Sequence, residues 1–499
     1  MTAPFWQFRE FSLSHRRGSE EQRLLSDVTL TVPVGGFYLM VGESGGGKSS
    51  LMRLCTGLLE AREPPPRTSG EFQCLGIRTE GGAPRELQEQ VSAILQDEGL
   101  IDDLTPKQNI ELALRAAGRS RKLAVGLLAE VGLDPAPERI ASLSGGMRKR
   151  LAVARALAAS PRVLFCDEPV AGLDPRAARQ IASLLHKSHE ANEDRTTVVI
   201  THDVASFEGL YDGMIVLDRK ERTLQLVGPE TEWEPGPVVR QSPDGHSEGE
   251  LIHGARKQLL SLAAIGQTVF DSIRRLPPVE FGQVWHSILR AAITPAPFVA
   301  LSCAVIGGLA MFFALRNNPV EGGFESALIT GTGKVLMAVL VPLLSAFFFT
   351  ARVAAGAAAR LGTMQRNHQV AALRMMGVDP ADFLLTPLVW GLVIALPLVT
   401  LVGAIAAAFA SWFAAATVSG ITPLGWSTAF FATVDATDLR VVLLKSSLSG
   451  YLVALTCYHL GTGPKRSGAD VGEAVNKAIV VSMGLVLGVH AILTFAVYG

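Results

Sequence analysis

The chain has 499 residues, of which 48% are hydrophobic and 18% are charged, and its mean hydropathy is +0.30. An average soluble domain carries about 25% charged residues. Here the charged residues crowd the first half and become sparse after Arg290. This composition excludes a disordered chain and a wholly soluble protein. The net charge of −1 gives no sign of a polyanion-binding surface, so we expect no nucleic-acid partner.

Two further features indicate the compartment. The N-terminal sequence MTAPFWQFRE lacks a basic segment followed by an apolar run, so we expect no cleaved signal peptide. The cysteines show no metal-ligand spacing, which fits small apolar residues in a reducing compartment. They are Cys55, Cys74, Cys166, Cys303 and Cys457.

Residues 1–228 alternate short β-rich runs with helical stretches. The runs FYLMVG, RVLFCDEP and TTVVITHD are continuous apolar segments that end in glycine or polar residues. Such segments are typical of buried parallel strands, and their alternation with helices predicts an α/β domain.

Residues 229–254 are rich in Pro, Gly, Glu and Ser, and we interpret them as a linker. A helical region, 255–290, follows. Within it, residues 259–276 place apolar side chains at helical spacing and end with two arginines. Two interpretations stay open, an amphipathic helix on a membrane surface and an ordinary packing helix.

Residues 291–499 contain long stretches without charge, and a membrane-spanning helix needs about 20 apolar residues. We expect five spans, at 291–315, 335–351, 383–413, 446–464 and 478–499. The charge-free stretch from 383 to 434 is long enough for a hairpin, but the turn-rich SGITPLGW at 419–426 favours one helix. The predicted fold is an α/β domain followed by an all-α membrane domain.

Basic residues orient these spans. With residues 1–228 in the cytoplasm, the 351–382 loop is cytoplasmic and rich in arginine, whereas the 414–438 loop on the opposite side has no Lys or Arg. We therefore expect a multi-pass protein of the cytoplasmic (inner) membrane with its α/β domain in the cytoplasm.

The segment from Gly42 to Ser49, GESGGGKS, lies between an expected strand and an expected helix, which predicts a phosphate-binding loop. Backbone N–H groups of the glycines would surround the phosphates of ATP. Lys48 would reach the β- and γ-phosphate oxygens, and the Ser49 hydroxyl would bind Mg²⁺. The expected nucleotide-binding residues are Gly42, Gly45, Gly47, Lys48, Ser49 and Ser50.

Two carboxylates, Asp167 and Glu168, end the apolar run at 163–166. A buried parallel strand delivers such side chains to its carboxyl end, where ligands bind in open α/β sheets. We expect Asp167 to hold Mg²⁺ through water and Glu168 to polarise the attacking water.

Further motifs stand in a fixed order along the chain. They are Gln96, Leu143-Ser144-Gly145-Gly146, Gly172-Leu173-Asp174 and His202 in TTVVITHD. With the phosphate-binding loop, they resemble the ATP-binding cassette ATPases over residues 5–228.

This resemblance implies roles for single residues. Ser144, Gly145 and Gly146 would bind the γ-phosphate held by the opposite subunit, so that two copies meet head to tail. His202 would contact the γ-phosphate, and Asp174 would belong to the nucleotide site. Gln96 would bind the metal, with Ser49 and Asp167, and would link the metal site to the permease. With Glu168, His202 and Gln96 form the expected catalytic set. For the family's base-stacking aromatic residue, Phe11 is the nearest candidate, with Leu13 or His15 in the neighbouring register.

Residues 255–499 resemble the MlaE-like permease of the MCE-associated Mla lipid transporters. The resemblance depends on ARVAAGAAARLGTM at 351–364, ALRMMGVDP at 372–380, DLRVVLLKS at 438–446 and the final span. Cassette and permease are usually separate chains in this system, and here they are fused.

The chain departs from the permease pattern in two places. The family carries an Arg-Glu-Leu-x-Pro run in its second span, where this chain has AVLVP at 338–342. The family's cytoplasmic loop, whose coupling helix docks on the ATPase, usually carries carboxylates, and this chain has Arg360, His368 and Arg374 there.

Lys445 is the lone charge at the start of the fourth span. A charge inside a membrane costs at least about 2.5 kcal/mol on insertion scales, so we expect this lysine to face a cavity or an anionic headgroup on the substrate path. The alternative is a lysine that reaches an interface near the end of the span.

The resemblance implies an ATP-hydrolysing lipid transporter that uses ATP and Mg²⁺. It would work as a homodimer, on membrane lipid, with an MCE-domain partner on the extracytoplasmic side. Two alternatives stay open, a cassette exporter of lipophilic drugs or lipoproteins and a non-transporting ATPase that signals across the membrane.

Overall fold

A computed structural model describes residues 4–17, 20–43, 45–58, 66–79, 82–192, 194–231, 281–317, 324–465 and 467–498. The predicted linker from residue 232 on, and the predicted helical region up to residue 280, lie outside the described residues. The chain forms two compact units, one of Met1–His246 with Asn367–Asp379 and one of Ser247–Arg366 with Pro380–Gly499. A short segment of the second half therefore groups with the first.

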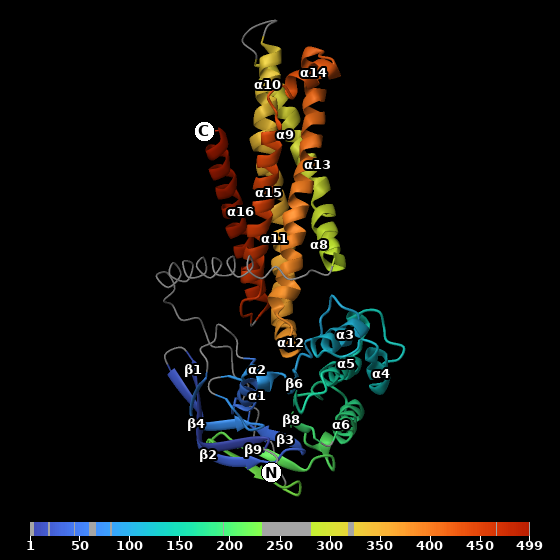
Figure 1. Cartoon of the computed structure of the whole chain (residues 1–499), viewed down its shortest axis with the longest axis vertical. Coiled ribbons are helices and arrows are strands. Elements are labelled where there is room, and N and C mark those ends of the chain that lie inside the picture. The colour runs from blue at the N-terminus through green and yellow to red at the C-terminus, as the bar shows by residue number, and fades with distance from the viewer. Residues whose placement is uncertain are drawn as a thin grey trace. The chain divides into compact units, whose positions relative to one another are not determined.

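The first unit contains two sheets (Figure 1). The larger has the strand order β10-β9-β3-β8-β7-β6, in which β10 is antiparallel to its neighbour and the other neighbouring pairs are parallel. Its strands are β3 (Phe37–Gly42), β6 (Val91–Ile94), β7 (Val163–Asp167), β8 (Thr196–Ile200), β9 (Gly213–Asp218) and β10 (Thr223–Val227). The smaller, antiparallel sheet has the order β2-β1-β4-β5. Its strands are β1 (Trp6–Arg17), β2 (Glu20–Val32), β4 (Arg67–Cys74) and β5 (Ile77–Arg78).

Helices and short turns complete this unit. They are α1 (Lys48–Thr56), α2 (Arg85–Gln88), α3 (Pro106–Ala116), α4 (Leu123–Glu130), η1 (Ile140–Ser142), α5 (Gly145–Ala158), α6 (Pro175–Glu190), η2 (Ala205–Phe207) and α12 (Gln369–Met375). The predicted α/β domain with buried parallel strands is confirmed.

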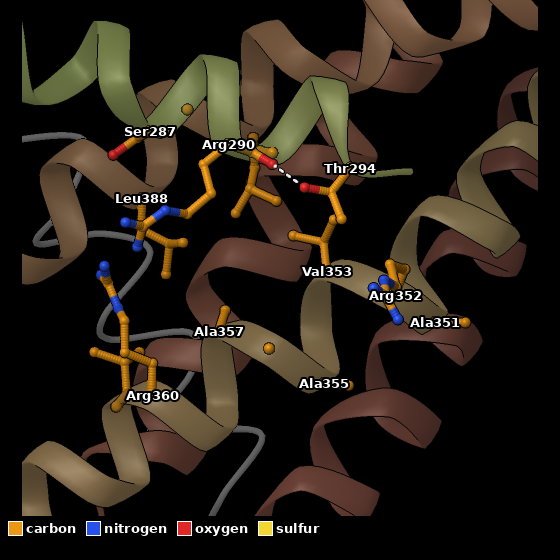
Figure 2. Close-up of a pocket in the computed structure, with 15 residues that line it drawn as sticks. Ser287, Arg290, Thr294, Ala351, Arg352, Val353, Ala355, Ala357, Arg360 and Leu388 are labelled. Carbon is orange, nitrogen blue, oxygen red and sulfur yellow. Dashed lines mark hydrogen bonds between the residues drawn. The ribbon is translucent and has the colours of Figure 1, made fainter. Parts of the chain in front are cut away.

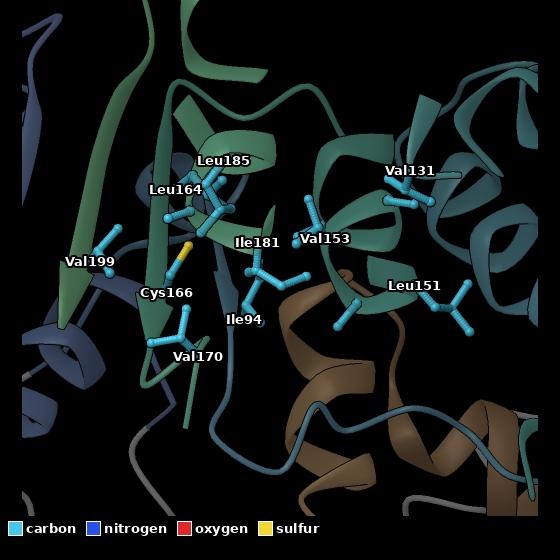
Figure 3. Close-up of a cluster of buried hydrophobic side chains, with 14 of the residues drawn as sticks. Ile94, Val131, Leu151, Val153, Leu164, Cys166, Val170, Ile181, Leu185 and Val199 are labelled. Carbon is cyan, nitrogen blue, oxygen red and sulfur yellow. The ribbon is translucent and has the colours of Figure 1, made fainter. Parts of the chain in front are cut away.

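Both faces of the parallel sheet are covered, which explains the continuous apolar runs of its strands. On one face, Leu164 and Cys166 of β7 pack in a cluster with Val153 of α5 and Ile181 of α6 (Figure 3). On the other face, the neighbouring Phe165 belongs to a second cluster that includes residues of β1 and α1. Successive residues of one strand thus enter two different cores.

Phe11 lies in the second of these cores, which corrects the expectation that it stacks on adenine. Its side chain is 1% exposed and its ring centroid lies 5.4 Å from that of Phe8 and 5.4 Å from that of Phe72. Leu13 is also buried. Neither side chain is available to a base, because each is already buried in the hydrophobic cluster that also contains residues of β4 and α1.

The second unit consists of helices. They are α8 (Phe281–Ile293), α9 (Ala296–Arg316), α10 (Glu325–Val335), the π-helical turn η3 (Leu336–Leu340), α11 (Val341–Arg366), the π-helical turn η4 (Ala381–Leu385), α13 (Thr386–Ser419), α14 (Pro423–Phe430), α15 (Ala436–Gly461) and α16 (Gly468–Tyr498). Within the described residues, five helical stretches are long and apolar enough to cross a membrane: 296–316, 325–366, 381–419, 436–461 and 468–498. The predicted count of five spans is confirmed.

The third stretch is one helix, as predicted. Gly420, at a φ of +62°, ends α13, and the separate helix α14 follows at once. The prediction of a loop at 351–382, however, is wrong over most of its length. Helix α11 continues through Arg352 and Arg360 to Arg366. Only the short segment around α12 lies outside the long helices.

Glycines allow the long helices to pack closely, as small residues do in membrane bundles. A Cβ atom on Gly307 of α9 would lie 2.5 Å from the carbonyl oxygen of Ala407 in α13. A Cβ on Gly450 of α15 would lie 2.5 Å from the carbonyl oxygen of Leu392 in the same helix α13. Helix α13 is therefore held between α9 and α15 by backbone-to-backbone contact.

Candidate functional site

Four neighbouring parallel strands bring the predicted catalytic segments to one edge of the sheet. The phosphate-binding loop follows β3, His202 follows β8, Asp167 and Glu168 stand at the end of β7, and Gln96 follows β6. Parallel strands present their carboxyl ends at the same edge, so segments far apart in the sequence meet there.

The phosphate-binding loop turns through glycines into helix α1. Gly42, Gly45 and Gly47 have φ values of +149°, +76° and +110°, a region that favours glycine. The free N–H groups at the start of α1 provide an anion-binding site. Lys48 is 7% exposed, and its Nζ donates to the carbonyl oxygens of Gly42 at 2.6 Å and Glu43 at 3.0 Å. The ammonium therefore lies within the loop, while Ser50 is half-buried in the first turn of α1.

Ser49 and Asp167 form the part of the site that fits a metal ion. The Ser49 hydroxyl donates to Asp167 Oδ2 at 3.3 Å. Burial raises the pKa of the Asp167 carboxyl, and the hydrogen bond from Ser49 opposes this effect. No group of three or more His, Cys, Asp or Glu that could hold a metal occurs among the described residues. Two oxygen ligands suit Mg²⁺, which binds through few protein groups and completes its shell with phosphates and water.

Glu168 and His202 face each other beside this pair. The distance from Glu168 Oε1 to His202 Nε2 is 3.5 Å. Glu168 adopts a φ of +49°, and its N–H donates to the carbonyl oxygen of Ile200 at 2.9 Å, which ties the end of β7 to the end of β8. Burial raises the pKa of Glu168 to about 7, and the negative charge of Asp167 adds to this effect. Burial, followed by the charge of Lys48, lowers the pKa of His202, which keeps the imidazole neutral at pH 7.

This arrangement can activate water next to a bound phosphate. A carboxyl group with a pKa near 7 is suited to accept a proton at neutral pH. The neutral imidazole can hold a hydrogen bond without adding charge, and Lys48 supplies the positive charge for the phosphate oxygens.

Ser144 and Asp174 lie at the starts of two helices. The Ser144 hydroxyl accepts from the Met147 N–H of α5 at 3.4 Å, and Asp174 Oδ1 accepts from the Arg176 and Ala177 N–H groups of α6 at 3.1 and 3.0 Å. Both side chains are exposed, and among the described residues neither hydrogen-bonds to the phosphate-binding loop of its own chain. Gly145 is exposed as well, and a Cβ on Gly146 would meet no atom within 4 Å. The signature segment thus presents an open surface.

Two protein-family models match the chain. The family model described as ABC transporter matches residues 25–171, and the family model described as Permease MlaE matches residues 284–496. The chain joins an ABC transporter ATPase domain to an MlaE permease domain. Its cassette binds ATP, and the chain is a multi-pass membrane protein with five candidate spans in the described residues.

Single relatives cover parts of this fusion. The macrolide export ATP-binding/permease protein MacB of Agrobacterium fabrum is 31% identical over 289 residues, which are 53% of this chain and 43% of that protein. The methionine import ATP-binding protein MetN of Nocardia farcinica is 36% identical over 223 residues, 43% of this chain and 65% of that protein. The chain therefore spans less than two thirds of the length of either. A solved dimeric ATP-binding cassette with bound ADP and Pi is 28% identical, with a TM-score of 0.39, and covers 46% of this chain and 100% of its own.

The cassette also holds residues whose roles the sequence motifs did not reveal. Lys149 of α5 donates to the carbonyl oxygen of Gln96 at 2.9 Å and lies 3.2 Å from the Glu98 carboxylate. Arg155 of the same helix is 4% exposed and donates to the carbonyl oxygens of Glu98 and Gly99. The signature helix thereby holds the segment after β6. Both residues lie in RKRLAVARAL, which follows the signature segment. A basic residue on an otherwise apolar helix face is the sequence feature that could have revealed their role.

The same segment contacts residues 367–379, which belong to this unit. Gln369 Nε2 donates to Asp102 Oδ2 at 2.7 Å, and His368 Nε2 lies 3.6 Å from Asp97 Oδ2. A Cβ on Gly99 would lie 2.9 Å from the Cβ of Ala372. The chain segment between two membrane helices is therefore packed on the segment that carries Gln96, whose own side chain is exposed.

In the MlaE domain, Lys445 is completely buried among helices. Its Nζ donates to the Thr494 hydroxyl of α16 at 2.8 Å and to the carbonyl oxygen of Ala338 in η3 at 3.4 Å, and it lies 5.4 Å from the Tyr498 ring centroid. The ammonium thus lies beside Thr494 and Tyr498 in the last turns of α16, so the substrate-path position and the interfacial alternative both stay predictions. The acid nearest in the chain, Asp438, is already bound by Lys334 at 2.6 Å and by the Tyr498 hydroxyl at 2.6 Å.

Proposed function

We propose that the chain is an ATP-driven transporter of phospholipid-like molecules in the cytoplasmic (inner) membrane, with its ATPase domain in the cytoplasm. It works as a homodimer together with an MCE-type lipid-binding protein on the extracytoplasmic side. The packing of residues 367–379 on the Gln96 segment carries this proposal, because it joins the hydrolysis site to the ends of α11 and α13. The MlaE family match over residues 284–496 supports the lipid class.

The first step is hydrolysis at the edge of the ATPase sheet. Lys48 and the N–H groups of the loop bind the phosphates, and Ser49 with Asp167 fits Mg²⁺, which neutralises phosphate charge when bound. Glu168 accepts a proton from the attacking water, and His202 orients the γ-phosphate. The open signature segment at Ser144 supports a second cassette as the group that closes each site.

The second step transmits closure to the membrane domain. The signature helix α5 holds the Gln96 segment through Lys149 and Arg155, and that segment holds residues 367–379 through Asp102 and Asp97. Movement of α5 on cassette closure therefore displaces the ends of α11 and α13. Coupling of this kind needs an element that can adopt two arrangements. The contacts from α5 through the Gln96 segment to residues 367–379 form a continuous connection that could carry such a change.

The MacB relative keeps the drug-exporter alternative open, since its printed name describes macrolide export. The MlaE match over the membrane residues favours lipid instead. A signalling ATPase without transport is disfavoured because the segments 317–324 and 420–435, which join candidate spans, are short.

The test is lipid transfer by the reconstituted full chain. Liposomes with fluorescent phospholipid are mixed with a soluble MCE-domain acceptor, and transfer is followed with ATP and without it. ATP-dependent transfer by the wild type, and none by Glu168→Gln, is the expected result. ATP hydrolysis with macrolide movement and no lipid transfer would favour the exporter, and hydrolysis with neither would favour the signalling ATPase.

A further inference from the structure

We propose that Arg179 is a positioning residue for His202 and acts through the turn that follows β8. This turn, residues 201–208, leads from the end of β8 into η2. Arg179 lies in α6, five residues after Asp174, which caps that helix. The inference rests on the proposed role of His202 at the γ-phosphate, and it names the group that fixes His202 in place.

His202 takes its position from its backbone. Its side chain is 43% exposed, and its contact with Glu168 Oε1, at 3.5 Å, is longer than an ordinary hydrogen bond. An exposed side chain is not wedged in place by its neighbours. The direction of the imidazole therefore depends on the groups that fix residues 201–208.

Hydrogen bonds within the turn fix the residues on both sides of His202. The Asp203 N–H donates to Thr201 Oγ1 at 3.0 Å, and Thr201 is completely buried. Ser206 donates twice to the Asp203 carboxylate, from its N–H to Oδ1 at 3.1 Å and from its hydroxyl to Oδ2 at 2.6 Å. Ser206 thus connects the far end of the turn to the residue that follows His202.

Arg179 binds this far end from helix α6. Its Nη1 donates to the carbonyl oxygen of Ser206 at 3.1 Å and to that of Glu208 at 2.9 Å. The two carbonyl groups flank Phe207, which is completely buried in the hydrophobic cluster that also contains Ile181 of α6. Hydrogen bonds from an ionised donor are about twice as strong as neutral ones, so Arg179 fixes both carbonyl groups relative to α6.

These contacts form a short path from α6 to the hydrolysis site. Arg179 holds Ser206, Ser206 holds Asp203, and Asp203 is the chain neighbour of His202. Without the guanidinium, the turn relaxes while the burial of Phe207 keeps η2 in place. A displacement of about 1 Å at a catalytic group can cost a factor of about 100 in rate. Loss of Arg179 therefore slows the chemical step without unfolding the domain.

The test measures ATP hydrolysis by the full chain in mild detergent, at steady state and in a single turnover with radiolabelled ATP. Arg179→Ala should lower kcat about tenfold and leave KM for ATP unchanged, because Lys48 and the phosphate-binding loop are intact. Ser206→Ala removes the hydroxyl bond to Asp203 and should change kcat in the same direction, by less. The unfolding temperature of Arg179→Ala should equal that of the wild type.

A double variant shows whether Arg179 acts through His202. His202→Ala removes the side chain that Arg179 positions, and it should lower turnover by itself. Added to His202→Ala, the change Arg179→Ala should lower the residual single-turnover rate by less than about twofold, against about tenfold in the wild type. A bond that only stabilised the domain would have the same effect in both chains.

Two controls remove a similar group elsewhere. Arg176→Ala removes an exposed arginine in the first turn of α6. Thr294→Val removes a side-chain bond to a backbone carbonyl in the other compact unit, where the Thr294 hydroxyl donates to the carbonyl oxygen of Arg290 at 3.0 Å (Figure 2). This pair lies on the wall of a cavity of about 470 Å³ between α8, α11 and α13. Both controls should leave kcat and KM unchanged.

Unchanged kcat in Arg179→Ala, a tenfold loss that persists in the His202→Ala chain, or an equal loss in either control would overturn the inference. Loss of turnover in His202→Ala together with full turnover in Arg179→Ala would contradict this inference alone and leave the proposed function standing. Full turnover in His202→Ala would instead contradict the role that the proposed function gives to His202.

Discussion

The carboxyl group of Glu168 controls hydrolysis through its ionisation. Its pKa is raised from 4.5 to about 7 by burial and by the charge of Asp167. A base must be ionised to accept a proton, so kcat/KM for ATP should fall as the pH decreases through about 7. Between pH 4.5 and about 7, the Glu168 carboxylate binds a proton in the folded free enzyme, whereas an exposed glutamate would stay ionised. The measurement is the pH profile of kcat/KM, and a flat profile down to about pH 5 would contradict it.

Substitution separates binding from chemistry at the same site. Glu168→Gln should abolish steady-state hydrolysis and preserve ATP binding, because Lys48 and the loop N–H groups remain. Lys48→Ala should weaken binding itself, since it removes the charge that faces the β- and γ-phosphates. Equilibrium binding of a fluorescent nucleotide and phosphate release measure the two effects. If Glu168→Gln retained most of its turnover, the assignment of the water-activating carboxylate would be wrong.

Lys445 offers a test of the substrate path at a single residue. Lys445→Met keeps most of the side-chain volume and removes the donor that binds Thr494 and Ala338. We expect fewer lipids transferred per ATP hydrolysed, and Lys445→Glu should be worse because it repels phosphate. Arg440→Ala, an exposed change in the same helix, is the matched control. Equal transfer per ATP in all variants would show that Lys445 is a structural residue.

Helix ends were the least predictable elements, for a physical reason. The charge-free stretches mark apolar surface, but a helix continues until its backbone groups are capped. Helix α15 begins where Asp435 and Asp438 form a capping box, well before the predicted start at 446. Helix α16 likewise begins at Gly468, ten residues before the predicted 478. The arginines of α11 were interpreted as a loop, although a charged side chain at a membrane surface is compatible with helix.

The nucleotide site was predictable because its chemistry is local in sequence. Lys48 and Ser49 lie in one loop, and Asp167 with Glu168 ends one strand. The contact between Asp102 and Gln369 crosses 267 positions, and no periodicity or spacing signals it. The burial of Phe11 also escaped prediction, because it depends on how β1 pairs with β4.

Helix packing in the membrane domain predicts a contrast between two glycines. Gly450→Ala should lower the unfolding temperature of the chain, since the added Cβ would lie 2.5 Å from the Leu392 carbonyl oxygen and overpacking costs about 1–3 kcal/mol. Gly484→Ala in α16 is the control, because a Cβ there would meet no atom within 4 Å. It should be neutral or slightly stabilising. Thermal unfolding in detergent measures both, and an equal effect of the two changes would argue against close contact between α13 and α15.

The contact of residues 367–379 with the segment after β6 predicts energetic coupling between Asp102 and Gln369. The hydrogen bond to a charged acceptor should contribute about 1.5–3 kcal/mol, and Gln369 is 2% exposed. Asp102→Ala and Gln369→Ala should each lower transport-coupled hydrolysis, and the double variant should add little to either one. Stimulation of ATPase activity by lipid measures this in a double-mutant cycle. Additive effects would mean that the contact does not transmit closure.

On the scale of the whole molecule, fusion sets the stoichiometry of the parts. Every membrane domain carries one cassette. Each cassette presents its signature segment on an open surface, and among the described residues Ser144 makes no hydrogen bond to the phosphate-binding loop of its own chain. A homodimer of the fused chain therefore contains two complete composite sites and two permease domains. A monomer contains the residues of one site without the geometry that closes it.

Mixed dimers test this head-to-tail arrangement. Chains with Ser144→Arg are assembled with chains that carry Lys48→Ala. In the heterodimer, one site combines an intact Lys48 with an intact Ser144, and the other combines both defects. Nucleotide occlusion should return to about half the wild-type level in the heterodimer, as one site of two predicts, and neither variant homodimer should occlude nucleotide. Trapped nucleotide is measured after rapid desalting of differently tagged, doubly purified dimers. Occlusion by an isolated monomer, or none in the heterodimer, would contradict the arrangement, because Ser144 would then act within its own chain.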